Sequence, residues 1–275
     1  MTATMWLPPL VRALTTALLV VSASAVAETL GPFWGALIAS FPVSTGPAYV
    51  FLAMQHGADF VAASALSSFA ANAANGLFLI AYGVLARSAP PWRSLGAAVL
   101  VWLAASLATQ QVVWTPLTAF LLNLAIYGTG FTVLGVDRGT RSGPALLARR
   151  RWFDLPARAV AVAAFVSLLV AVSTALGSGI TGIAAVFPIS LISLFVIVRA
   201  RIGGPAASQL AANALRSMLG FGMMLLALHL AIRPWGAAAA FAVALLAWVF
   251  WSAALLLLRR REQLGQNGLP PVADA

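Results

Sequence analysis

The chain contains no cysteine and no lysine, and it is poor in acidic residues and in histidine. The lack of cysteine excludes disulfides and thiolate metal sites. Only six acidic residues and two histidines, His56 and His229, are present, and they are scattered along the sequence. No paired acids and no serine–histidine constellation stand out, so the sequence disfavours an enzyme. We expect neither a cofactor nor a bound metal.

What the chain has in abundance is apolar residues. They make up 62% of the 275 residues, and charged residues only 8%, whereas a soluble domain carries roughly 25% charged residues. A mean hydropathy of +0.97 cannot be spread over a surface that faces water, so lipid must surround most of the chain. The net charge of +10 does not indicate nucleic-acid binding, because the arginines lie in short segments between apolar runs, as in membrane proteins.

Nine apolar runs are long enough to cross a bilayer as helices, which takes about 20 residues each. The sequence therefore predicts an all-α fold, a polytopic integral membrane helix bundle of about nine transmembrane helices. The runs are Pro9–Ala27, Phe33–Gln55, Phe60–Ala86, Trp92–Thr109, Thr115–Val136, Ala157–Leu176, Ile180–Val198, Ala206–Ile232 and Trp235–Leu258.

The arginines predict the orientation of these spans. When the central linker Asp137–Pro156 is placed in the cytoplasm, thirteen of the sixteen basic residues fall on that side, in agreement with the positive-inside rule. This predicts a multi-pass protein of the bacterial cytoplasmic (inner) membrane, with the N-terminus outside and the C-terminus inside. The thirteen are Arg87, Arg93, Arg138, Arg141, Arg149, Arg150, Arg151, Arg158, Arg199, Arg201, Arg259, Arg260 and Arg261.

An internal repeat divides the chain. Residues 11–53 align without a gap with residues 157–199, and Phe41-Pro42-Val43-Ser44 then matches Phe187-Pro188-Ile189-Ser190. Farther along, the offset of 146 residues becomes 149. The repeat also argues that residues 1–28, which look like a signal peptide, are a retained span, because they match a membrane helix.

The repeat predicts the domain organisation. Residues 1–110 form a first repeat of four spans, 111–156 hold span five and a basic loop, 157–260 form the second repeat, and 261–275 are a disordered tail. Because an odd number of spans separates the copies, the second copy is inverted, as in many secondary transporters.

The second half resembles the small four-helix membrane proteins of the GlpM type. The resemblance rests on Phe187-Pro188, Gly203, Arg216, Gly220 and Trp251. It implies a four-helix unit and no particular activity. The tandem, inverted form is also similar to the architecture of small drug/metabolite transporters.

Proline interrupts span two and span seven at corresponding positions. Pro42 with Ser44 and Thr45, and Pro188 with Ser190, are therefore candidates for a substrate site between the halves. The alternative is that these are ordinary proline kinks, whose freed carbonyls are satisfied locally.

Arg216 is the one charge deep inside a span, and Gln209 and Asn213 precede it on about the same helical face. An arginine at the bilayer centre costs roughly 2.5–3.5 kcal/mol on insertion scales, so we expect it to face the interior. It would bind an anionic substrate group, or it is a structural or snorkelling arginine.

A polar stripe runs along span three. Ser64, Ser68, Asn72 and Asn75 follow helical spacing on one face. They line a substrate path or hold helices together, and the sequence favours neither reading. Glu28, at an end of span one, is a candidate proton-coupling carboxylate or a helix-capping charge.

These features favour a secondary transporter or permease of a small, anionic or amphiphilic substrate, working by alternating access at the repeat interface. The alternatives are a non-transporting accessory subunit of an envelope polysaccharide or lipid pathway, and a passive channel. The expected partners are the lipid bilayer and an unknown small molecule, with no nucleic acid, and the protein is a monomer or a homodimer.

Overall fold

The computed structural model describes residues 44–135 and 154–267, together with Thr15 and Leu18. This part of the chain is all-helical and holds no strand, which confirms the all-α prediction. Most of span one, Glu28, Pro42 and most of the basic linker, which the sequence singled out, lie outside the described residues. The helices are α3 (Thr45–Gln55), α4 (Ala58–Leu85), α5 (Pro91–Gln110), α6 (Pro116–Leu134), α7 (Asp154–Ala185) and α8 (Ile189–Asn267).

Five helices in the described part are long and apolar enough to cross a membrane. Their number and composition indicate a membrane protein. The expected spans three, four and five correspond to α4, α5 and α6 to within two residues at each boundary. The five are Ala58–Leu85, Pro91–Gln110, Pro116–Leu134, Ala159–Val196 and Gly203–Leu258.

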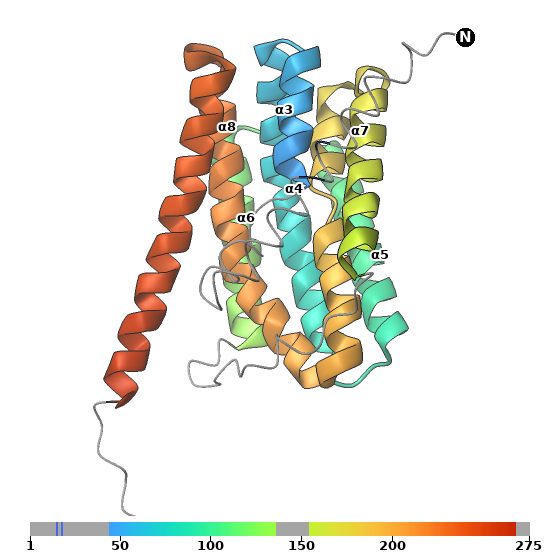
Figure 1. The fold of residues 1–275 in the computed structure, drawn as a ribbon, viewed down its shortest axis with the longest axis vertical. Coiled ribbons are helices and arrows are strands. Elements are labelled where there is room, and N and C mark those ends of the chain that lie inside the picture. Colours follow the sequence, from blue (N-terminus) through green and yellow to red (C-terminus); the bar gives the residue numbers. More distant parts are fainter. Residues whose placement is uncertain (1–14, 16–17, 19–43, 136–153, 268–275) are drawn as a thin grey trace, which may run out of the picture.

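The two longest of these helices are interrupted. Gly177 in α7, and Gly203 and Gly236 in α8, have φ values of 71°, 82° and 73° with ψ near 180°, a conformation open essentially only to glycine. A straight helix of 56 residues would be about 84 Å long, against a hydrocarbon core of about 30 Å. Figure 1 shows that α8 instead folds back on itself, so that its last stretch (red) runs in the opposite direction to the stretch before it (orange).

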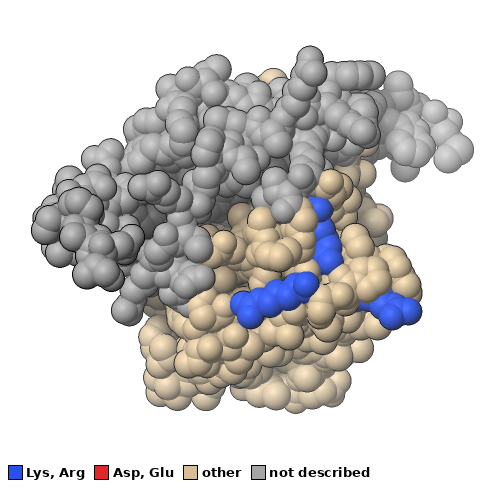
Figure 2. All heavy atoms as spheres, turned by 90° about the horizontal axis from the view of Figure 1, so that it is seen from below, with Lys and Arg blue, Asp and Glu red and all other residues tan. Residues whose placement is uncertain are grey.

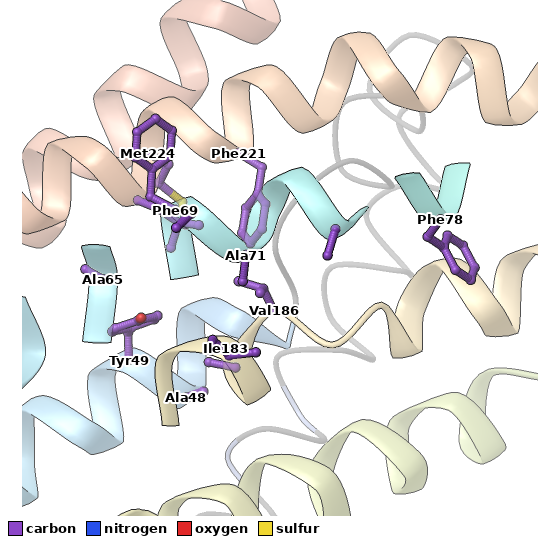
Figure 3. Packing of buried hydrophobic residues seen from close by; sticks show 14 of the residues in the cluster. Ala48, Tyr49, Ala65, Phe69, Ala71, Phe78, Ile183, Val186, Phe221 and Met224 are labelled. Atoms are coloured by element: carbon purple, nitrogen blue, oxygen red, sulfur yellow. The ribbon is translucent and has the colours of Figure 1, made fainter. Parts of the chain in front are cut away.

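Helix α4 lies at the centre of the bundle. In its most apolar window 72% of the residues are buried, against 28% in α5 and in α6. Its buried face is rich in alanine, serine and glycine, the small residues that let membrane helices approach closely. Figure 3 shows Ala65, Phe69 and Ala71 of α4 packed among apolar side chains of α3, α7 and α8.

Three contacts between segments far apart in sequence sort the helix ends into two groups. At one end, Arg233 pairs with Asp59 at 2.8 Å and His56 bonds to Ser173 at 2.8 Å. At the other, Arg87 donates to the Leu134 carbonyl at 2.9 Å. We call these the Asp59 end and the Arg87 end.

Helix α4 and the stretch of α8 between its two interrupting glycines therefore run in opposite directions. The α8 stretch begins at Gly204, which is packed against the Ala86 carbonyl at the Arg87 end. It reaches the Asp59 end at Arg233. In contrast, α4 begins beside Asp59 and ends at Leu85.

Candidate functional site

A break in the helices lies about halfway along the bundle (Figure 1). Helix α7 ends at Ala185, the next three residues are not helical, and α8 begins at Ile189. Pro188, which has no N–H to donate, ends this segment. The Phe187 amide donates to the Ala184 carbonyl at 2.9 Å, and the Phe187 carbonyl accepts from Ile189 at 2.8 Å. The break expected in the second half is thus present at Pro188.

Helix α3 begins at the same place. The Thr45 hydroxyl donates to the Ala185 carbonyl at 2.9 Å, and this bond satisfies a carbonyl that the end of α7 leaves free. Ser44 and Thr45 are buried. The Ser190 hydroxyl oxygen is also buried and has no hydrogen-bond partner within the described part. The structure therefore brings Thr45 to the break that precedes Ser190, although the two segments are far apart in sequence.

The last turns of α7 are packed directly against α4. A Cβ atom at Gly182 would overlap the carbonyl oxygen of Ser64, so only glycine permits this approach. The Ser68 hydroxyl donates to the Gly182 carbonyl, and Tyr49 of α3 bonds to the Ser68 hydroxyl at 2.6 Å. Ser64, fully buried, has a hydroxyl without a partner among the described residues.

A pocket of about 330 Å³ opens beside these turns, toward the Asp59 end. Ser67 of α4 contributes one wall, the end of α5 another, and α7 the third. The described lining carries no charge and mixes polar with apolar side chains. It includes Ser67, Thr109, Gln110, Trp114, Gly179 and Ile183.

The asparagines of α4 are engaged in a closed hydrogen-bond network. Asn72 donates to the Asn123 side chain and to the Met218 carbonyl, both at 3.1 Å. Asn75 accepts from Trp102 at 2.8 Å, and the Tyr127 hydroxyl donates to the Asn72 carbonyl at 2.9 Å. This network connects α4 with α5, α6 and α8, so the amides of Asn72 and Asn75 serve helix packing.

Arg216 lies on α8, away from the lining of the pocket. Its side chain is half-buried and makes no hydrogen bond or ion pair within the described part of the chain. Its backbone carbonyl accepts from the Trp251 indole at 2.8 Å, and Trp251 packs against Gly220 so closely that a Cβ there would overlap the ring. Gln209 and Asn213 are also half-buried.

A second polar cluster lies at the Arg87 end. Arg87 donates through Nε to Ser208 at 3.0 Å and Arg199 donates to the Ala89 carbonyl. The Tyr82 hydroxyl is buried next to the Arg199 guanidinium, yet neither Tyr82 Oη nor Arg199 Nη1 has a hydrogen-bond partner among the described residues.

Sequence reasoning missed the pocket and the proximity of Tyr82 to Arg199. Gln110 and Trp114 follow an apolar run, where a polar residue and an indole also suit an ordinary membrane interface. Their approach to Gly179 depends on tertiary contacts between residues about 70 positions apart in sequence, and no local pattern indicates them.

No family model, curated protein or solved structure matches the chain. The resemblance to the GlpM-type proteins therefore rests on the quoted residues alone, and the functional argument rests on the site itself.

Proposed function

We propose that the chain is a secondary transporter whose moving part is the break between α7 and α8. The observation that carries the proposal is non-helical backbone halfway along an apolar bundle, from Val186 to Pro188, met by the start of α3. At membrane depth such backbone is tolerated where it is buried in protein or lines a cavity. Discontinuous helices of this kind bind substrates and ions in many transporters.

The pocket beside the break is the proposed substrate site. Its volume of about 330 Å³ lies at the lower end of the range for small-molecule sites. Ser67 and Gln110 offer hydrogen bonds, whereas Ile183 offers apolar contact. Because its described lining carries no charge, we propose a small amphiphilic substrate without net charge at this site. Arg216 remains a separate candidate for an anionic group.

We further propose nine spans arranged as an inverted repeat. With the offset of 146 residues, Gly57 before α4 corresponds to Gly203 in α8, and Ser44 before α3 corresponds to Ser190. In each half a helix thus begins near one of these serines, reaches a glycine, and is followed by a long helix. The two long helices run in opposite directions, as inversion requires.

The proposed orientation places the Arg87 end in the cytoplasm of a bacterial cell. Figure 2 looks at the molecule from below, and the described atoms in view include basic side chains and no acidic one. Arg87, Arg93 and Arg199 belong to this end, whereas Arg233 at the other end is paired with Asp59. An excess of arginine on one side supports this orientation.

Single cysteines test this proposal, and the natural chain has no cysteine to interfere. We expect a membrane-impermeant maleimide to label Val113→Cys and Trp235→Cys from outside only, and Ser88→Cys from inside only, in intact cells and inside-out vesicles. Alternating access predicts that Ser67→Cys is labelled from both sides, because the pocket opens to each in turn.

Two results would contradict the proposal separately. If Trp235→Cys is unlabelled, Gly236 lies within the membrane and the nine-span arrangement is wrong. Labelling of Trp235→Cys on the same side as Ser88→Cys contradicts the arrangement as well, because the two positions should lie on opposite sides. If Ser67→Cys reacts from one side only, or from neither, alternating access at this pocket is wrong. A fixed accessory subunit would give that second result.

A further inference from the structure

Among the described residues, the arginines of the Arg87 end are not paired with a carboxylate. Arg87 uses its donors on the Ser208 hydroxyl and the Leu134 carbonyl, and Arg199 uses one on the Ala89 carbonyl. All three acceptors are uncharged. Within the described residues, the ion pair of the molecule lies at the opposite end, between Arg233 and Asp59.

Two buried atoms at this end lie next to each other, and neither has a hydrogen bond of good geometry to any described residue. They are Arg199 Nη1 and Tyr82 Oη, and the Tyr82 side chain is 1% exposed. Tyr82 is held in place by stacking on Phe195, with ring centroids 4.1 Å apart. A buried donor that makes no hydrogen bond costs free energy. We therefore expect a hydrogen-bond acceptor to bind between α4 and α8.

The surroundings of the cluster indicate a membrane interface. Trp92, at the start of α5, is 69% exposed, and the Arg93 guanidinium lies 4.8 Å from the centre of its ring. Exposed tryptophan and arginine at helix ends are typical of the headgroup region. Basic pockets between membrane helices on the cytoplasmic side bind anionic headgroups.

We propose that Arg87, Arg199 and Tyr82 form a binding site for the phosphate of an anionic phospholipid headgroup. Arg199 Nη1 and the Tyr82 hydroxyl donate to the phosphate from the buried side. Arg87, which is exposed, and Arg93 approach it from the rim. The site is independent of the transport proposal, since it lies at the other end of α4 from the pocket.

The experiment compares the full-length protein in nanodiscs of pure phosphatidylcholine with nanodiscs that also contain phosphatidylglycerol. We expect phosphatidylglycerol to raise the thermal unfolding midpoint, and native mass spectrometry to show retained phosphatidylglycerol. Arg199→Gln and Arg87→Gln should each weaken this binding about fivefold, which corresponds to roughly 1 kcal/mol for one arginine near an anionic surface.

Arg233→Gln is the matched control, because it removes one arginine at the Asp59 end and should leave lipid binding unchanged. Tyr82→Phe retains the stacked ring and removes only the unpaired hydroxyl, so it tests the site even if Arg199→Gln fails to fold. This variant should retain less phosphatidylglycerol, and its stability in pure phosphatidylcholine should not fall. If Arg233→Gln loses as much lipid binding as Arg199→Gln and Arg87→Gln, the proposed site is wrong. The lipid site is also wrong if inorganic phosphate stabilises the protein as much as phosphatidylglycerol does.

Discussion

Gly182→Ala is expected to destabilise the protein far more than the same change at Gly179, three residues earlier in α7. The new Cβ would overlap the Ser64 carbonyl oxygen, and this atom belongs to the backbone of α4, which cannot rotate away. The two helices must separate, and the Ser68 bond to Gly182 is lost with them. Overpacking costs typically 1–3 kcal/mol, and we expect about 3 kcal/mol here.

The matched control is Gly179→Ala, three residues earlier on the same turns of α7. A Cβ at Gly179 meets nothing within 4 Å, and alanine favours helix over glycine by up to about 1 kcal/mol. The stability of both variants is compared through their thermal unfolding midpoints in detergent. Gly179→Ala should match or exceed the parent, whereas Gly182→Ala should fall well below it. Equal midpoints for the two variants would show that the close packing of α7 on α4 does not exist.

Asn72→Leu is expected to give the second large loss of stability. Leucine is similar in size, yet it leaves the Asn123 side-chain oxygen and the Met218 carbonyl without their donor. Hydrogen bonds between membrane helices contribute about 0.6 kcal/mol on average and up to about 1.7 kcal/mol each. Losing two should therefore cost about 1–3 kcal/mol in the free energy of unfolding, measured by denaturation in mixed micelles.

Asn213→Leu is the matched control for this variant. Asn213 is half-buried on α8 and makes no hydrogen bond within the described part of the chain, so its replacement should cost little. The double variant Asn72→Leu with Asn123→Leu should cost less than the sum of the single variants, because both remove the same bond. Strict additivity, or an equal cost for Asn213→Leu, would contradict the network.

Local chemistry explains which features of the fold were predictable. Pro188 removes a helical donor wherever it lies, so the break was expected from the sequence. Gly203 precedes a second glycine and Pro205, a pattern typical of a helix boundary. The spans that became α4, α5 and α6 have uninterrupted apolar runs, and their ends agree with the helices of the structure.

Contacts between distant segments explain what was not predictable. Helical spacing places Asn72 and Asn75 on one face, but it does not show that Asn123 and Met218 lie opposite them. The structure therefore favours packing for these asparagines, where the sequence favoured neither role. Likewise, the expectation that Arg216 faces the interior came from its cost in lipid alone, and the structure places its side chain half-buried.

The proposed transport is tested most directly by solute uptake into proteoliposomes that contain the purified protein. The panel comprises small neutral sugars, amino acids and carboxylates, with Ser67→Trp to fill the pocket and Leu246→Trp as a control. Leu246 is 64% exposed on the last stretch of α8, so tryptophan there leaves the pocket open. We predict saturable uptake of at least one uncharged or zwitterionic solute, lost in Ser67→Trp and retained in Leu246→Trp. Absence of saturable uptake for every solute, by a protein that remains folded, would contradict a transporter and support an accessory subunit.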